Sequence, residues 1–121
     1  PDGIVYGWIE DNLTDRHGLN YCCFPVISRA AVEAAGAWFP DDFPFWGSDV
    51  VVWRIFDNVG RICVLPMTID HVSPHTGKRA IDETGAYVAS RDNPDPRGRD
   101  ISVEVERIRG AIALASPPET C

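Results

Sequence analysis

The sequence has few basic residues and no long apolar run. Its 11 Lys and Arg residues stand against 18 Asp and Glu residues, which gives a net charge of −7. General binding to nucleic acid or to an acidic membrane surface depends on Lys and Arg, so this balance argues against both partners. No apolar run approaches the roughly 20 residues that span a bilayer, and no basic and then apolar leader opens the chain. We therefore expect a soluble protein whose partners are neutral or are reached through a metal.

Cysteines are also few, and their spacing does not suit a disulfide scaffold. Cys22 and Cys23 are adjacent, Cys63 lies in a strand-like run and Cys121 is terminal. This pattern favours a reducing, cytoplasmic compartment. The 121 residues are 45% hydrophobic, which is enough to build the core of one globular domain.

The clearest local pattern lies between Ser48 and Gly60. Ser48 is a good helix N-cap and Gly60 is a good residue to follow a helix, so residues 49–59 are predicted to be helical. Four apolar residues share one face of this helix: Val52, Ile55, Phe56 and Val59. A carboxylate in the first turn faces the positive end of the helix dipole. We therefore predict that Asp49 is ionised, exposed and suited to act as a base.

The remaining patterns predict an α/β fold, with a small mixed sheet flanked by helices. The predicted strands are 3–9, 21–27, 61–65 and 67–72, and the predicted helices are 29–35, 49–59 and 101–115, with an element of undetermined type at 80–89. Pro25 marks the second strand as an edge or irregular strand, whereas the third is predicted to be buried. We expect residues 1–89 to form one domain, and residues 90–121 to form a connector and a helix that packs on this domain or on a partner.

The order of motifs along residues 2–82 resembles a known enzyme family. These motifs are Phe24-Pro25-Val26-Ile27-Ser28-Arg29, Val32-Glu33-Ala34-Ala35-Gly36, an aromatic loop, Gly47-Ser48-Asp49, Trp53-Arg54, Gly60-Arg61, Leu65-Pro66 and His71. As an ordered set they resemble the C-terminal, acceptor-side half of a family 2 type glycosyltransferase with a GT-A fold. The helix near the C-terminus would be an addition to that half.

This resemblance implies roles for individual residues. Asp49 matches the acid that acts as general base on the acceptor hydroxyl in inverting members. His71 matches a histidine that helps to hold a divalent metal, Mn²⁺ or Mg²⁺, against the diphosphate of the nucleotide sugar. The positions implied to line a sugar or glycan acceptor are Trp38, Trp46, Gly47 and Ser48. Ser48 departs from the family, which often has Glu at this position, so a paired-acid motif is absent.

A larger departure is that the 121 residues leave no room for the nucleotide-binding half that precedes this segment in the family. Glu10-Asp11-Asn12 follows a strand and superficially resembles the Asp-x-Asp metal motif of that half, but its place in the order fits the acceptor side better. The chain is therefore expected to be a portion of an enzyme. Apolar surface that the other half would cover predicts self-association, with a homo-dimer as the simplest form.

Several alternatives stay open. The chain fits a non-catalytic interaction or carbohydrate-binding module that kept the aromatic cleft. It also fits a small metal-binding domain that uses His71, His75 and a cysteine, although Pro74 argues against a helical pair and Cys22 and Cys23 would project to opposite sides of a strand. Asp49 alone is equally consistent with a residue that only complements the helix dipole, and His71 with a structural histidine.

Overall fold

The fold is a small mixed α/β arrangement in the computed structural model of the chain. The residues that the structure describes are 2–12, 21–37, 40–43, 47–73, 79–89, 91–92 and 94–115. Three strands form a sheet in the order β2-β1-β3, with bounds Tyr6–Glu10 for β1, Val26–Ile27 for β2 and Ile62–Thr68 for β3. β1 runs antiparallel to β2 and parallel to β3. The predicted small mixed sheet with helices is confirmed, whereas the likeness to a GT-A fold stays a prediction.

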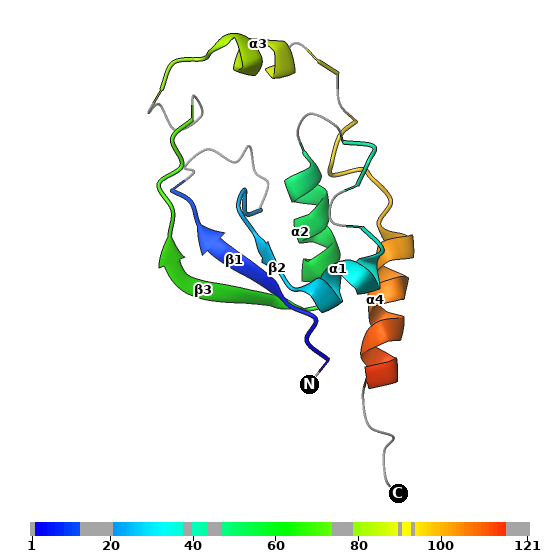
Figure 1. Cartoon of the computed structure of the whole chain (residues 1–121). Helices are drawn as coiled ribbons and strands as arrows, with labels where there is room; N and C mark the ends of the chain where they lie inside the picture. The colour runs from blue at the N-terminus through cyan, green and yellow to red at the C-terminus, as the bar shows by residue number, and fades with distance from the viewer. Residues whose placement is uncertain are drawn as a thin grey trace, which may run out of the picture.

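Four helices complete the described fold. They are α1 (Arg29–Ala35), α2 (Ser48–Asn58), α3 (Glu83–Ala89) and α4 (Ser102–Ala115). The helices α1, α2 and α4 lie together on one side of the sheet, and α3 lies apart from them at the top of Figure 1. No helix within the described residues has the length and apolar character needed to cross a membrane.

The helix α1 has the predicted bounds because both of its ends carry strong local signals. The Ser28 side chain accepts a hydrogen bond from the N–H of Ala31 at 3.2 Å. At the other end, Gly36 has a φ of 87°, and its N–H donates to the carbonyl oxygen of Val32. The helix α2 begins one residue earlier than predicted. Gly47, with a φ of 91°, is the N-cap, and Ser48 is the first helical residue instead of the cap.

The strand β3 differs from its prediction in length and in burial. It is one continuous strand instead of two, and it is largely exposed instead of buried. It pairs with β1 on one side and lies at the edge of the described sheet. Pro66 is tolerated there because it sits where the register between β1 and β3 shifts, between the pairs Trp8 with Val64 and Glu10 with Thr68.

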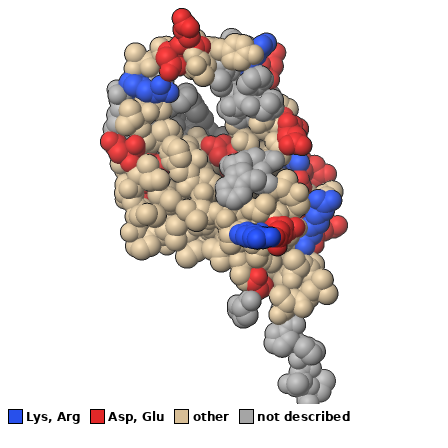
Figure 2. All heavy atoms as spheres, in the orientation of Figure 1, with Lys and Arg blue, Asp and Glu red and all other residues tan. Residues whose placement is uncertain are grey.

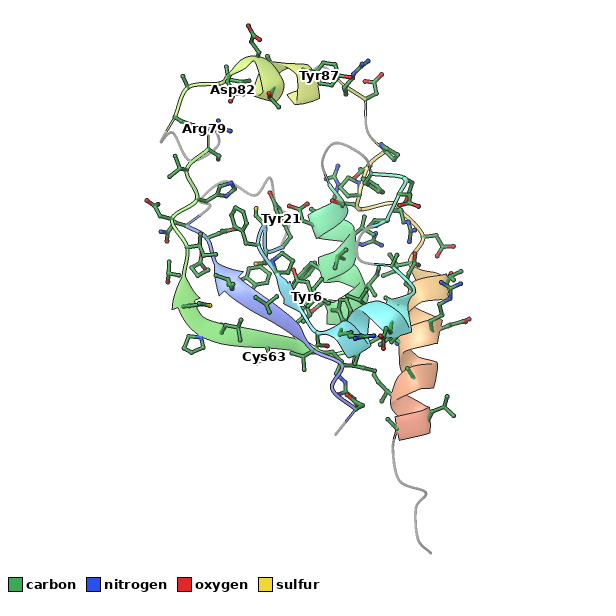
Figure 3. All side chains as sticks on the ribbon, in the orientation of Figure 1. Tyr6, Tyr21, Cys63, Arg79, Asp82 and Tyr87 are labelled. Atoms are coloured by element: carbon green, nitrogen blue, oxygen red, sulfur yellow. The ribbon has the colours of Figure 1, made fainter. Side chains whose placement is uncertain are left out.

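The predicted strand 21–27 also shrinks, since its regular part is confined to β2. The core lies between the sheet and the helices. The Tyr6 ring of β1 stacks on the Phe56 ring of α2, with the ring centres 5.5 Å apart (Figure 3). The helix α4 packs on α1 and α2 and adds buried Val105 and Ile108 to the same core. The division into residues 1–89 and 90–121 stays a prediction.

Candidate functional site

The strand topology brings three chemically reactive side chains to one end of the sheet. Because β1 and β3 are parallel, they end at the same edge, where the N–H of Ile69, just after β3, donates to the carbonyl oxygen of Glu10, the last residue of β1, at 2.7 Å. Asp11 follows β1, and His71 lies shortly after β3. Since β2 is antiparallel to β1, the chain that leads into β2 reaches the same edge and carries Cys23 there.

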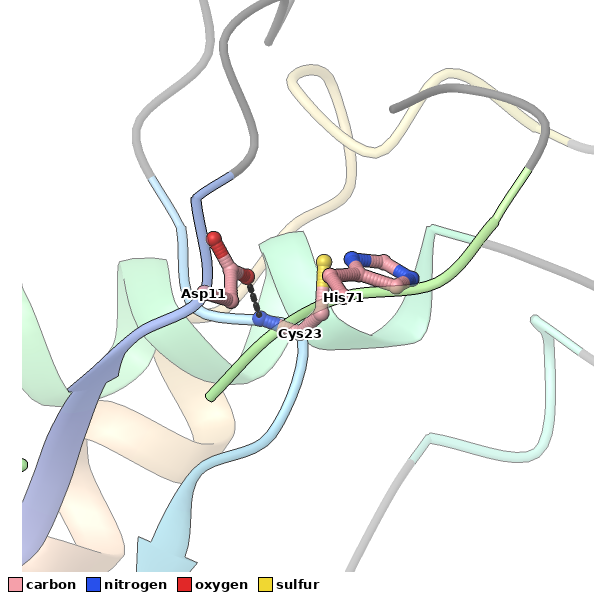
Figure 4. Close-up of side chains that lie close together, drawn as sticks. All are labelled: Asp11, Cys23 and His71. Carbon is pink, nitrogen blue, oxygen red and sulfur yellow. Dashed lines mark hydrogen bonds between the residues drawn. The ribbon is translucent and has the colours of Figure 1, made fainter. Parts of the chain in front are cut away.

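Asp11, Cys23 and His71 form a compact group, which we call the Asp-Cys-His cluster (Figure 4). One carboxylate oxygen, the sulfur and one ring nitrogen all lie within 4.8 Å of one another. The Asp11 side chain is fully buried, whereas Cys23 and His71 are half-buried. The Oδ2 atom of Asp11 accepts a hydrogen bond from the Cys23 N–H at 3.2 Å. This contact fixes the carboxylate against the segment that carries the thiol.

A ring contact orients His71, and the neighbour of Cys23 points away from the cluster. The His71 ring meets the edge of the Phe24 ring, with the ring centres 4.9 Å apart and an angle of 77° between the planes. The neighbouring Cys22 points into the core, where its sulfur lies 3.3 Å from the N and 3.2 Å from the O of Ile9. The two adjacent cysteines therefore point to different sides, and Cys23 alone of the pair belongs to the cluster.

Asp49 adjoins this cluster from the first turn of α2. Its side chain is half-buried, not exposed as predicted. Burial raises the pKa of Asp49, and the negative charge of Asp11 adds to that rise. Hydrogen bonds from the N–H of Val50, at 2.9 Å, and from the Cys23 side chain act in the opposite direction on this pKa. Asp49 is thus a carboxylate held in a partly dry site.

The other residues expected at the acceptor site lie near the start of α2 or outside the described residues. Gly47 is buried, and a Cβ atom built on it would lie 3.1 Å from the Phe43 ring, so glycine is needed there for both space and φ. Ser48 is half-buried beside Asp49. Trp38 and Trp46, together with His75, fall outside the described residues, and the roles predicted for them stay predictions.

Sequence reasoning singled out Asp49 and His71 but missed Asp11 and Cys23 as their neighbours. The available signal was weak: an acid directly after one strand and a thiol shortly before another. That signal points to a common site only once β1 is known to pair with both β2 and β3. Local patterns do not determine this pairing.

The cluster offers one oxygen, one sulfur and one nitrogen donor. Magnesium prefers near-octahedral oxygen ligands, and manganese is also best served by carboxylates, carbonyls and water. Thiolate and imidazole ligands suit zinc. The donor set therefore fits the expected Mg²⁺ or Mn²⁺ poorly.

A separate hollow of about 360 Å³ lies among α1, α2 and α4. Its apolar wall includes Val52 and Phe56, and no member of the Asp-Cys-His cluster is among its described lining residues. At its rim, Arg99 forms ion pairs with both Asp42 and Glu104.

No protein-family model, curated protein or solved structure matches this chain. The resemblance to glycosyltransferases therefore depends on the motifs of the sequence alone.

Proposed function

We propose that this chain is the acceptor-side portion of a nucleotide-sugar-dependent glycosyltransferase, with Asp49 as its general base. One observation carries the proposal. Asp49 and His71, to which the resemblance gives chemical roles, approach the same thiol: Asp49 through a hydrogen bond with Cys23, and His71 within the Asp-Cys-His cluster. Residues from α2 and from beyond β3 thus share one site, as an acceptor site that uses both would require.

In the proposed reaction, Asp49 takes the proton of an acceptor hydroxyl group. The hydroxyl oxygen forms a bond to the anomeric carbon of the donor sugar as the bond to the nucleoside diphosphate breaks, and the diphosphate leaves with the bonding electron pair. A half-buried carboxylate suits this role because a base is most effective when its pKa lies near the working pH. Trp38, Trp46, Gly47 and Ser48 would contact the acceptor, since sugar rings stack on aromatic side chains.

The test is a transfer assay combined with calorimetric titration. The purified chain is titrated with uridine and guanosine diphosphate sugars, with and without Mn²⁺, and is then assayed for hydrolysis and transfer. We expect Asp49→Asn to lower turnover by about 100-fold or more while donor binding is kept. Asp57→Asn is the matched control, because Asp57 is an exposed acid on the same helix. Equal turnover in Asp49→Asn and the unmodified chain would refute Asp49 as the general base, and no binding of any donor together with no transfer would favour the second candidate below.

A second candidate is a non-catalytic interaction module that associates with itself. The observation that favours it is the apolar surface of β3, where Val64 is 74% exposed and Met67 is 53% exposed. In Figure 2 the face over β3 carries few charged side chains. Sedimentation of the chain and of Val64→Lys tests this candidate: it requires a dimer that the substitution dissociates, and a monomer at all concentrations would exclude it.

A further inference from the structure

We propose that Asp11, Cys23 and His71 bind a zinc ion. The inference does not depend on the proposed function, because it concerns the affinity of the chain for a metal in the absence of nucleotide sugar and acceptor. Its ligands also differ from the Mn²⁺ or Mg²⁺ site that the resemblance implies, since they include a thiol.

The geometry of the cluster is close to that of a zinc site. Zinc binds sulfur, nitrogen and oxygen at about 2.0 to 2.3 Å, so two ligands of a tetrahedral site lie about 3.3 to 3.7 Å apart. The three donor atoms lie within 4.8 Å of one another. Small side-chain rotations of the half-buried Cys23 and His71 would close the remaining gap of about an ångström, with little change in the backbone.

The surroundings of the cluster also favour a cation. The Asp11 carboxylate is fully buried, and the chain as a whole carries a net charge of −7. Burial of charge is costly unless an opposite charge compensates it. A divalent ion that binds a Cys23 thiolate together with Asp11 would supply that compensation, and the thiol proton is released to solvent when the metal binds.

Contacts beyond the ligands hold them in place for binding. The Cys23 N–H donates to the oxygen Oδ2 of Asp11, and the Phe24 ring packs against His71. Such outer contacts orient ligands in known metal sites. The three ligands follow β1, precede β2 and follow β3, so a bound ion would link the ends of all three strands. Three protein ligands leave one position of a tetrahedral site for water.

The experiment uses the full chain after removal of metal with a chelator. Zinc is titrated in competition with a chromophoric chelator, and Co²⁺ is added separately as a spectroscopic probe. We expect one zinc ion per chain, and an intense thiolate-to-cobalt charge-transfer band in the near ultraviolet. Cys23→Ser is expected to remove this band and to weaken zinc binding by roughly 100-fold or more, since loss of an outer contact alone costs 10- to 100-fold. His71→Gln is expected to weaken binding while the thiolate band persists.

Cys63→Ser is the matched control, because Cys63 is an exposed thiol on β3. This variant should bind zinc as the unmodified chain does. The proposal is overturned if the metal-free chain binds no zinc, if Co²⁺ gives no thiolate band, or if Cys23→Ser and Cys63→Ser bind zinc equally well. Circular dichroism of each variant verifies that it is folded. The zinc titration contains no sugar, so a negative result there does not bear on the proposed transferase. A negative transfer assay likewise does not bear on the proposed zinc site.

Discussion

Replacement of Arg54 by Met is expected to detach the segment before α4 from α2. The Nη1 atom of Arg54 donates hydrogen bonds to the carbonyl oxygens of Pro96, at 2.7 Å, and of Arg99, at 2.8 Å. Pro96 is buried and Arg99 is half-buried, so solvent replaces these bonds only in part. One guanidinium group therefore fixes residues 96–99 against the helix. Methionine keeps most of the apolar stem of arginine and removes both donors.

The size of the effect follows from the two bonds. A hydrogen bond from a charged group contributes about 1.5 to 3 kcal/mol, and water recovers part of this at the Arg99 carbonyl. We expect Arg54→Met to lower the free energy of unfolding by about 2 to 4 kcal/mol. For a chain of this size, that corresponds to a fall of roughly 10 °C in the melting temperature.

Urea unfolding followed by circular dichroism measures this loss, with Arg29→Met as the matched control. Arg29 also forms a short contact, 2.7 Å to Glu33, but the two side chains are 91% and 62% exposed. Exposed pairs of this kind contribute at most about 0.5 kcal/mol. Arg54→Met should also accelerate cleavage by trypsin after Arg97 in the native state. If Arg54→Met costs no more stability than Arg29→Met, the two hydrogen bonds do not hold this segment.

Three further predictions concern stability. Burial raises the pKa of Asp49 above its ordinary value of 3.8. Between that value and the raised pKa, the folded state binds more protons than the unfolded state. The free energy of unfolding therefore falls as the pH rises through this window. Metal-free Asp49→Asn should therefore melt at the same temperature as the unmodified chain at pH 3 and at a higher temperature at pH 7; equal melting at pH 7 would contradict the burial cost. Gly110→Ala should raise stability by about 0.5 to 1 kcal/mol, because Gly110 lies within α4 and a Cβ atom there meets nothing within 4 Å. Gly36→Ala should instead lower stability by about 1 to 2 kcal/mol, because its φ of 87° is left-handed and strains any residue with a Cβ atom; urea unfolding of the two variants must give opposite signs.

Local signals predicted the parts of the fold that local chemistry controls. The helix α1 was predicted with its observed bounds because Ser28 and Gly36 act within one helical turn of its ends. The start of α2 was predicted one residue late, since Ser48 is a better cap by composition but Gly47, at a φ of 91°, takes the N-cap position. The prediction that β3 is buried was wrong. Its place at the edge of the described sheet depends on which strands pair, and the apolar content of a strand does not reveal its pairing.

The candidate site shows the same division. Asp49 and His71 were identified from the order of motifs, but their neighbours Asp11 and Cys23 were not. Asp11 meets His71 because β1 pairs in parallel with a strand that begins more than fifty residues later in the chain. Such a long-range pairing has no local signature. The roles of Trp38 and Trp46 stay predictions, because both residues fall outside the part of the chain that the structure describes.

Pro66 interrupts an exposed and otherwise apolar edge strand. A fibril grows when the free backbone groups of such an edge template the next copy in register, and proline offers no N–H for that ladder. The register shift beside Pro66 further interrupts the regular pairing of β3 with β1. The strand can therefore keep the exposed apolar residues Val64 and Met67 with less risk of amyloid-like growth than their exposure alone would suggest.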